Sequence, residues 1–342
     1  MSSPEAEDLK AEINQFISDF AQMRVEIGQM IVGYEDIVER VLLCLLASGN
    51  VLLEGVPGLG KTLLVRCLSE VLHLNFSRIQ FTPDLMPADI VGTNVVMDDA
   101  SGRRVLQFQP GPIFTHLLLA DEINRATPRT QSALLESMQE HSVTVGGVTH
   151  VLEEPYFVMA TQNPIEQEGT YPLPEAELDK FMFKLVVPFP GFDELKEIIR
   201  RTTREDIPEL NIVTEREKIL QMRQLVRKMP VAEHVERYAG RMVLATHPDT
   251  EFATEMVKQY VRTGSSPRGI QALLLGGKIR ALLQGRYHVA CEDIQDIALP
   301  SLRHRMTMTF EGESENMTTD QIVENLLEEL EEFAEVESSA VT

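Results

Sequence analysis

The sequence predicts an α/β protein, a parallel β-sheet covered by helices on both faces, followed by a smaller helical subdomain. Two observations lead to this prediction. Between residues 51 and 187, short continuous apolar runs alternate with helical segments, which is typical of parallel strands buried on both faces. From Asp193 to about Leu302 the apolar residues recur with helical spacing instead.

Residues 4–30 are expected to form one helix, with Ser3 as its cap and Pro4 at its first position. Its apolar residues recur at alternating spacings of four and three, as in an a/d seam. They are Leu9, Ile13, Phe16, Phe20, Met23, Ile27 and Met30. Such a helix most often packs on its own domain. The alternative is a coiled-coil or subunit contact.

The sheet is predicted from short apolar runs that follow one another along the chain. The expected strands are Asn50–Glu54, Ser77–Phe81, Leu117–Asp121, Tyr156–Thr161 and Lys184–Val187. Helices are expected over Lys61–Leu72 and Gln131–Glu140.

Two β-hairpins are predicted to interrupt this pattern. In the first, Val95–Met97 and Val105–Phe108 flank the polar turn Asp98–Gly102. In the second, Ser142–Val145 and Val148–Leu152 flank Gly146-Gly147, a pair that suits a type I′ turn. A plain α/β core needs neither hairpin, so both are expected to be inserts.

The helical subdomain is predicted to follow the linker Pro188-Phe189-Pro190-Gly191. A capping box, Thr214 with Glu217, is expected to open a helix that reaches about Lys228. Further helices are expected near Ala232–Thr246, Pro267–Gln284 and Cys291–Leu299.

The last 32 residues form an acidic tail. Residues 311–342 hold eleven Asp and Glu and no Lys or Arg. Thr318 and Gln321 make a second capping box, after which one face is apolar: Ile322, Leu326, Leu330 and Phe333. This short helix is expected to be solvated and partly docked, or else to serve as a docking handle for a partner. The predicted domains are therefore 1–30, 31–190, 191–310 and 311–342.

Composition restricts the function classes. The net charge of −22 repels phosphate backbones, so nucleic acid is not an expected partner. Cys44, Cys67 and Cys291 are widely spaced and are expected to be reduced thiols of a cytoplasmic protein. The N-terminus lacks a signal-peptide pattern, and no apolar run is long enough to span a membrane.

Residues 55–62 read Gly-Val-Pro-Gly-Leu-Gly-Lys-Thr and fit the phosphate-loop pattern GxxxxGK[ST], also called Walker A. An apolar strand precedes the loop and a helix follows it. Backbone N–H groups and the helix N-terminus would bind phosphates, Lys61 would reach the β- and γ-phosphates, and Thr62 would ligate Mg²⁺. The expected nucleotide contacts in this segment are Gly55, Val56, Pro57, Gly58, Leu59, Gly60, Lys61, Thr62 and Leu63.

A second element of such a site, of Walker B type, follows the strand Leu117–Asp121. Asp121 lies at a strand C-terminus, where ligands bind in open α/β sheets. We expect Asp121 to hold Mg²⁺ directly or through water, and Glu122 to polarise the attacking water.

With these motifs the chain resembles the MoxR family of AAA+ ATPases over roughly residues 31–305. The resemblance rests on seven strings in the same order: Ile31-Val32-Gly33, Leu53-Glu54-Gly55-Val56-Pro57-Gly58, Gln80-Phe81-Thr82-Pro83-Asp84-Leu85-Met86-Pro87, Asp121-Glu122-Ile123-Asn124-Arg125-Ala126, Ala160-Thr161-Gln162-Asn163-Pro164-Ile165-Glu166, Leu173-Pro174-Glu175-Ala176 and Ser266-Pro267-Arg268. It implies a P-loop NTPase (AAA+) αβα sandwich with a small all-α lid.

The resemblance also implies residue roles. Asn163 looks like sensor 1, which orients the lytic water and reads the γ-phosphate. Arg268 looks like sensor 2, which reaches the γ-phosphate from the lid. Ile31 and Val32 look like the wall beside the adenine. The hairpins match the family's helix-2 insert (about 90–112) and pre-sensor-1 insert (about 141–155), which in similar proteins face a ring pore.

One position departs from the family. Where Leu-Asp-Arg-Phe is usual, and the arginine looks like a finger that reaches a neighbour's nucleotide, this chain has Leu178-Asp179-Lys180-Phe181. Lysine lacks the planar fork of arginine, so slow basal turnover is expected. Either Lys180 serves in trans, or another arginine does; the candidates are Arg125, Arg129, Arg303 and Arg305.

These observations predict a cytoplasmic, Mg²⁺-dependent ATPase that acts between the subunits of a ring, with a hexamer as the expected size. The resemblance implies chaperone-like remodelling or activation of a partner protein, such as one with a von Willebrand factor A domain. The alternative is a scaffold that binds ATP but hydrolyses it negligibly, because of Lys180. A GTPase is disfavoured, since neither NKxD nor TKxD occurs in the sequence.

Overall fold

The computed structural model describes residues 4–98, 103–164, 170–203 and 208–340. Some residues of the sequence analysis lie outside these ranges. They are Ser3, residues 99–102 of the turn predicted in the first hairpin, Ile165 and Glu166. The chain forms two compact units. The sheet unit comprises Ser18–Lys180 and Leu185–Arg223, and the helical unit comprises Met1–Ile17, Phe181–Lys184 and Gln224–Thr342. The four predicted domain ranges stay predictions.

The central sheet has five strands, in the order β2-β5-β8-β1-β9. The pairs β2–β5, β5–β8 and β1–β8 are parallel, as predicted. Each of β1, β5 and β8 is buried along its length and ends in a half-exposed residue, so three polar ends meet at one edge. The strands are β1 (Val51–Glu54), β2 (Phe76–Gln80), β5 (Leu117–Asp121), β8 (Phe157–Gln162) and β9 (Phe183–Val186).

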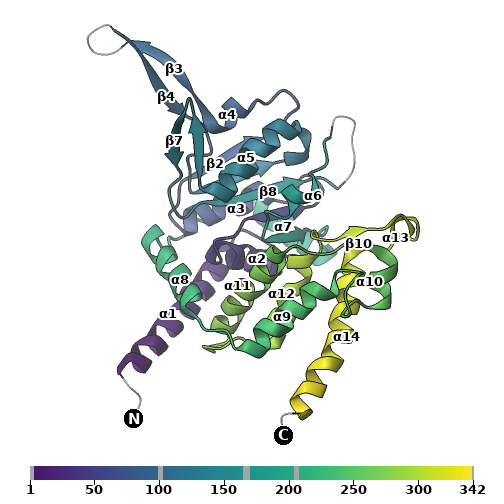
Figure 1. Ribbon diagram of the computed structural model, residues 1–342. Helices are drawn as coiled ribbons and strands as arrows, with labels where there is room; N and C mark the ends of the chain where they lie inside the picture. The colour runs from purple at the N-terminus through teal and green to yellow at the C-terminus, as the bar shows by residue number, and fades with distance from the viewer. Residues whose placement is uncertain (1–3, 99–102, 165–169, 204–207, 341–342) are drawn as a thin grey trace. The chain divides into compact units, whose positions relative to one another are not determined.

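The helices of the sheet unit precede, separate and follow these strands along the chain (Figure 1). Helix α2 was not predicted, yet eight of its residues are buried. Helix α5 begins at Pro128, three residues earlier than predicted, because proline suits the first turn of a helix. The helices are α2 (Glu35–Leu46), α3 (Lys61–Val71), α4 (Pro87–Val91), a 3₁₀ turn (Ile123–Arg125), α5 (Pro128–Glu140), α6 (Glu175–Leu178) and α7 (Phe192–Thr202).

Both predicted hairpins are present and antiparallel. They are formed by β3 (Gly92–Asp98) with β4 (Arg104–Pro110), and by β6 (Ser142–Val145) with β7 (Val148–Val151). Gly146 and Gly147 both have positive φ, 59° and 81°, as a type I′ turn requires. The two hairpins lie side by side (Figure 1), and the rings of Phe108 and His150 stack between them at 3.8 Å.

The helical unit holds most of the remaining helices and one short antiparallel strand pair, β10 with β11, which the sequence did not predict. The residues of α1 (Pro4–Gly28) and of α8 (Arg216–Lys228) are divided between the two units. Its elements are α9 (Glu233–Ala245), α10 (Glu255–Tyr260), β10 (Val261–Thr263), α11 (Pro267–Leu283), α12 (Cys291–Leu302), β11 (Thr307–Met308), α13 (Phe310–Ser314) and α14 (Thr319–Ala340). Helix α12 ends at Leu302, three residues later than expected.

The capping box predicted at Thr214 is wrong. Helix α8 begins at Arg216 and its first turn is closed by the Glu215 carbonyl, which accepts bonds from the backbone N–H groups of Lys218 and Ile219. Because the helix starts later than predicted, Glu217 is too near its N-terminus to reach back to Thr214. The Thr214 hydroxyl is buried and has no hydrogen-bond partner among the described residues.

The terminal helices are docked through their apolar faces. In α1 (Pro4–Gly28) the seam residues from Ile13 to Ile27 are at most 7% exposed, so the helix packs on its own chain and the seam offers no coiled-coil face. The second capping box is confirmed: Gln321 N–H donates to Thr318 Oγ1 at 3.3 Å. Ile322, Leu326 and Leu330 are buried, whereas the side chain of Phe333 lies outside the described part.

The three cysteines are free, as expected. No helix within the described ranges combines the length and apolarity that crossing a bilayer requires.

Candidate functional site

The loop between β1 and α3 has the conformation that phosphate binding requires. Gly58 and Gly60 have φ of 87° and 77°, values that favour glycine. Gly60 is the N-cap of α3, whose first residue is Lys61. The free N–H groups at this helix start make an anion site.

The side chain of Lys61 is already turned toward this loop. Its Nζ donates to the Gly55 carbonyl at 2.7 Å. Burial lowers the pKa of Lys61, and the nearby carboxylates of Asp121 and Glu122 partly oppose that shift. Burial removes part of the water that would solvate the ammonium group of Lys61. A bound phosphate replaces that water with a charge-assisted hydrogen bond, which favours phosphate binding at this position.

The loop forms one wall of a cleft of about 280 Å³. The cleft brings together Lys61, Thr62, Asp121, Glu122 and Asn163, five residues that the sequence analysis assigned to a single site. Its full lining is Gly55, Pro57, Gly58, Gly60, Lys61, Thr62, Arg78, Gln80, Asp121, Glu122 and Asn163. The grouping is observed, and the individual roles stay predictions.

Asp121 is held by hydrogen bonds on both carboxylate oxygens. Thr161 Oγ1 donates to Oδ1 at 2.7 Å. Arg78 donates to Oδ2 from Nη2 at 2.7 Å and from Nε at 3.3 Å. The carboxylate therefore has a fixed orientation toward the cleft.

Glu122 follows in a left-handed backbone conformation, with φ of 56°. Its N–H donates to Thr161 Oγ1 at 2.8 Å, so the same hydroxyl fixes both acidic residues. Its Oε2 accepts from Gln80 Nε2 at 3.2 Å and from Arg125 Nη1 at 2.9 Å. A non-glycine residue in this conformation is strained and is kept there by its surroundings.

Sequence reasoning missed Arg78, Gln80 and Thr161. The signal that would have found two of them is the register of the parallel sheet, which pairs Gln80 of β2 with Asp121 of β5. Because side chains two apart share one face of a strand, Arg78 points the same way as Gln80.

The cleft fits a hard divalent cation. Thr62 and Asp121, the predicted Mg²⁺ ligands, both line it and both offer oxygen, the donor that Mg²⁺ prefers. Among the described residues no group of three or more His, Cys, Asp or Glu is placed to hold a metal ion. Two protein oxygens completed by phosphate and water suit Mg²⁺, whereas they do not suit structural zinc.

A second, largely apolar cavity of about 340 Å³ opens beside the first. Gly58 and Gly60 line both cavities, so the two meet at the phosphate loop. The predicted residues Ile31, Val32, Leu59 and Leu63 line it, but Val56 is not among the lining residues of either cavity.

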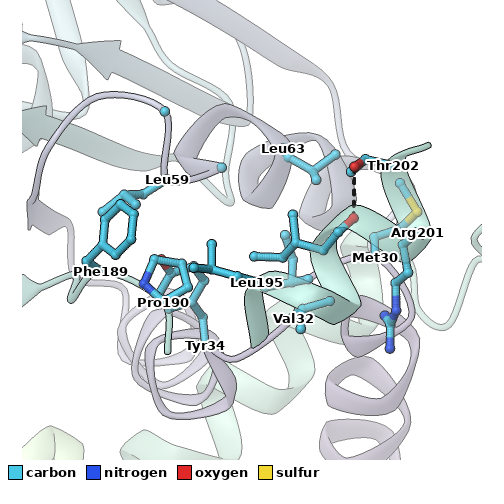
Figure 2. A pocket seen from close by; sticks show the side chains of 14 residues that line it. Met30, Val32, Tyr34, Leu59, Leu63, Phe189, Pro190, Leu195, Arg201 and Thr202 are labelled. Atoms are coloured by element: carbon cyan, nitrogen blue, oxygen red, sulfur yellow. Dashed lines mark hydrogen bonds between the residues drawn. The ribbon is translucent and has the colours of Figure 1, made fainter. Parts of the chain in front are cut away.

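Figure 2 shows the apolar side chains that converge on this cavity, and several of them were not predicted. Phe189 and Pro190 come from the linker and Leu195 from α7. Tyr34 donates to the Pro188 carbonyl at 3.1 Å; burial, and secondarily Glu194, raise its pKa. Flat apolar walls next to a phosphate loop suit a planar heterocyclic base.

Arg201 also lines this cavity. Its Nη1 donates to the carbonyls of Gly28 and Gln29 at 2.9 and 2.5 Å, which ties α7 to the end of α1.

The two remaining predicted residues lie outside this cleft. Arg268 stands in the first turn of α11, where its N–H is capped by Ser266 Oγ at 3.1 Å. It belongs to the helical unit, and its role stays a prediction. Lys180 is half-buried and its Nζ lies 2.9 Å from Glu177 Oε2.

The comparisons with known proteins agree with this site. Residues 50–183 match a model of the ATPase family associated with various cellular activities (AAA), and residues 253–326 match an AAA lid domain. Chaperone MoxR1 of Mycobacterium tuberculosis is 39% identical over 323 residues, which are 94% of this chain and 84% of that protein. Protein MoxR of Paracoccus denitrificans is 26% identical, with 88% of this chain and 92% of that protein covered.

A solved structure supports the same assignment. The crystal structure of an ATPase candidate from Cytophaga hutchinsonii is similar to this chain, with a TM-score of 0.88 and 36% identity. The match covers 95% of this chain and 98% of that one.

Proposed function

The chain belongs to the MoxR family of AAA+ ATPases, and on this premise we propose that it hydrolyses ATP with Mg²⁺ at the interfaces between subunits of a six-membered ring. The observation that carries the proposal is the cleft that unites the phosphate loop, Asp121, Glu122 and Asn163. The apolar cavity that meets it at Gly58 and Gly60 would take the adenine.

The residues of the cleft have distinct tasks in this reaction. The loop N–H groups and Lys61 bind the β- and γ-phosphates. Thr62 and Asp121 would hold Mg²⁺, which when bound neutralises phosphate charge. Glu122 accepts a proton from the attacking water, and Asn163 orients that water. The water oxygen bonds to the γ-phosphorus while the bond between the γ-phosphorus and the β–γ bridging oxygen breaks. The products are ADP and phosphate, and the proton passes from Glu122 to solvent.

The test of this proposal is Glu122→Gln, which removes the base but keeps the shape. We expect ATP to bind with an affinity within about threefold of the parent, while turnover falls by about 10²–10⁴. The measurements are nucleotide binding by calorimetry and phosphate release. Glu136→Gln, the same change at an exposed position of α5, is the matched control and should leave both unchanged. Undiminished turnover in Glu122→Gln would remove Glu122 from the mechanism.

Lys180 is proposed to reach the neighbouring subunit's nucleotide. The family's finger position carries this proposal, because Lys180 and three of the four alternative arginines are all engaged within the chain. Lys180 pairs with Glu177, Arg125 with Glu122 and Arg303 with Asp320, while Arg305 binds carbonyl groups. Arg129 is exposed.

The alternative function, an ATP-binding scaffold with negligible hydrolysis, is favoured by one observation, the ion pair that holds Lys180 to Glu177. Lys180→Arg separates the two functions. A gain in turnover of more than about 10³ would identify the native chain as a scaffold, because an arginine finger is worth about 10³–10⁵ in rate.

The client is proposed to be a protein that docks on the hairpins. These carry apolar side chains in solvent: Val96, Leu106, Val148 and Val151 are 57–75% exposed. Such side chains mark a protein interaction site. The family resemblance points to a partner with a von Willebrand factor A domain, and we place the reaction in the cytoplasm, without nucleic acid.

A further inference from the structure

Three consecutive residues just past the end of α12, Arg303, His304 and Arg305, bind the backbone of one distant stretch, residues 181–184. All of these residues belong to the helical unit. The stretch begins directly after Lys180, the last residue of a segment of the sheet unit. The contacts span about 120 positions of the sequence, so they are tertiary and not local.

Arg305 makes the most extensive of these contacts. Its Nη2 donates to the Phe181 carbonyl at 2.6 Å, and its Nη1 donates to the Met182 carbonyl at 3.1 Å and to the Ser301 carbonyl. The residue is only 8% exposed. A guanidinium with its donors fixed by carbonyls of its own chain is not available to a neighbouring subunit.

His304 binds the same carbonyl group as Arg305. Its Nε2 donates to the Phe181 carbonyl at 3.0 Å, because a carbonyl oxygen can only accept. Burial, and then the charge of Arg305, hold the pKa of His304 well below its usual range, so the ring is neutral. The buried Phe181 backbone is thus held by two side chains at once.

Arg303 connects this contact to the tail. Its Nε and Nη2 donate to the two carboxylate oxygens of Asp320 at 2.9 and 2.5 Å, and its Nη1 donates to the Lys184 carbonyl at 3.5 Å. Asp320 lies in the first turn of α14. A bidentate arginine–carboxylate pair has a fixed geometry, so α14 holds Arg303 in place.

We propose that Arg303, His304 and Arg305 are positioning residues for Lys180: they hold the backbone of residues 181–184, which follows Lys180 directly, and so restrict the backbone from which this cation would reach the next subunit. Consecutive Cα atoms are about 3.8 Å apart, so anchoring Phe181 leaves the Lys180 backbone little freedom. The inference rests on the proposed trans role of Lys180. Arg303 and Arg305 then support the trans contact by holding the backbone beside Lys180. They do not themselves reach the neighbouring nucleotide.

The test is whether two kinds of defective subunit regain turnover when they are mixed. A variant that is slow only because its own fold is damaged would not regain turnover in this way. Arg303→Ala should keep ATP affinity and lower turnover at least about tenfold, and the same is expected of Lys180→Ala. The double variant should be no slower than Lys180→Ala alone, since both changes act through the same group. Glu122→Gln subunits have a dead cleft but an intact Lys180 face. When Glu122→Gln and Arg303→Ala subunits are mixed one to one, turnover per Arg303→Ala subunit should be restored, because the Glu122→Gln neighbours supply a correctly held Lys180.

The controls separate the inference from its premise. Lys180→Ala mixed with Glu122→Gln should be restored in the same way, and Arg303→Ala mixed with Lys180→Ala should stay slow. If Lys180→Ala keeps full turnover or is not restored by mixing, the proposed trans role fails, and the inference fails with it. The positioning role alone is overturned if mixing restores the turnover of Lys180→Ala but not that of Arg303→Ala. It is also overturned if the double variant turns over more slowly than both single variants.

If thermal unfolding shows that Arg303→Ala does not fold, a second variant replaces it in the test. Asp320→Asn loosens Arg303 while leaving its charge and its bulk in place. Asp320 is 37% exposed, and asparagine keeps its size and an acceptor oxygen for Arg303, whose side chain is 12% exposed. The same loss and the same restoration by mixing are expected, and their absence would count against the proposal equally.

Discussion

At the scale of single residues, the acidic pair at the end of β5 is defined by the side chains around it. Arg78 binds Oδ2 of Asp121, and Thr161 binds Oδ1. A cation ligated by Asp121 must compete with this arginine. Arg78 is 45% exposed, so its ion pair is worth at most about 1 kcal/mol.

Arg78→Ala is therefore expected to lower the Mg²⁺ concentration needed for half-maximal tightening of ADP binding, by up to about fivefold. The measurement is calorimetric titration of ADP at several Mg²⁺ concentrations. Arg66→Ala, at an exposed position of α3, is the control. A requirement for more Mg²⁺ would instead mean that Arg78 binds phosphate.

Glu154 links the stability of the sheet unit to pH. Burial alone would raise its pKa, but hydrogen bonds with His141 at 2.5 Å and from Tyr156 N–H at 3.1 Å, with the charge of Arg223, lower it to about 2 from 4.5. A lowered carboxyl pKa stabilises the fold above the unfolded value and ceases to do so as the pH falls through the folded value. The contribution of Glu154 is therefore complete above about pH 4.5 and is lost toward about pH 2.

Glu154→Gln should destabilise the protein by about 1–2 kcal/mol at neutral pH, since the side chain is 40% exposed and solvent screens part of the interaction. The difference from the parent should shrink at about pH 3.5. Urea unfolding at both pH values checks this, with Glu136→Gln as control. A difference that does not change with pH would exclude the ionised form of Glu154 as the cause.

At the scale of elements, the acidic C-terminal helix is a packed part of the helical unit. Its apolar face was open to two interpretations, a docked helix or a handle for a partner. Ile322 and Val323 are fully buried and Leu326 is 1% exposed, so the first three turns are docked. In the described part of the charged face, Glu324, Glu328 and Glu329 are exposed, as expected for an acidic amphipathic helix.

Leu326→Ala should destabilise the helical unit by about 2–4 kcal/mol, because the change removes a buried side chain and leaves a cavity. Thermal unfolding followed by circular dichroism measures the loss. Glu328→Ala, two residues further on the exposed face, should change the midpoint little. An equal midpoint for parent and Leu326→Ala would mean that α14 is not docked in solution.

At the scale of the whole molecule, the proposed reaction needs more than one chain. The cleft lies within a single subunit, but the cation that completes it is proposed to come from another. Turnover per subunit should therefore rise with protein concentration until rings are complete. Phosphate release across a dilution series, compared with sedimentation at the same concentrations, checks this. Turnover per subunit that is constant while the mass falls to that of a monomer would contradict a trans mechanism.

Local patterns in the sequence were sufficient for the strands of the central sheet, the two hairpins and the two motifs of the cleft, but not for α2 or for the pair β10 and β11. The phosphate loop is one continuous string, the strands β1 and β5 are apolar runs, and the Gly146-Gly147 turn is a pair of neighbours. Each depends on residues that are close in the sequence, and periodicity and turn chemistry report such neighbours directly. The family resemblance added Asn163, which the structure places in the same cleft.

Only the tertiary structure decided which side chains fix the acidic pair and which anchor the segment after Lys180. Arg78 and Thr161 lie about 40 positions from Asp121, and Arg305 lies 124 positions from Phe181. The sequence left Arg303 and Arg305 open as trans cations, and the fold directs them to carbonyls of their own chain. The physical reason is that such contacts depend on strand register and on the packing of distant elements, and neither leaves a periodic trace along the chain.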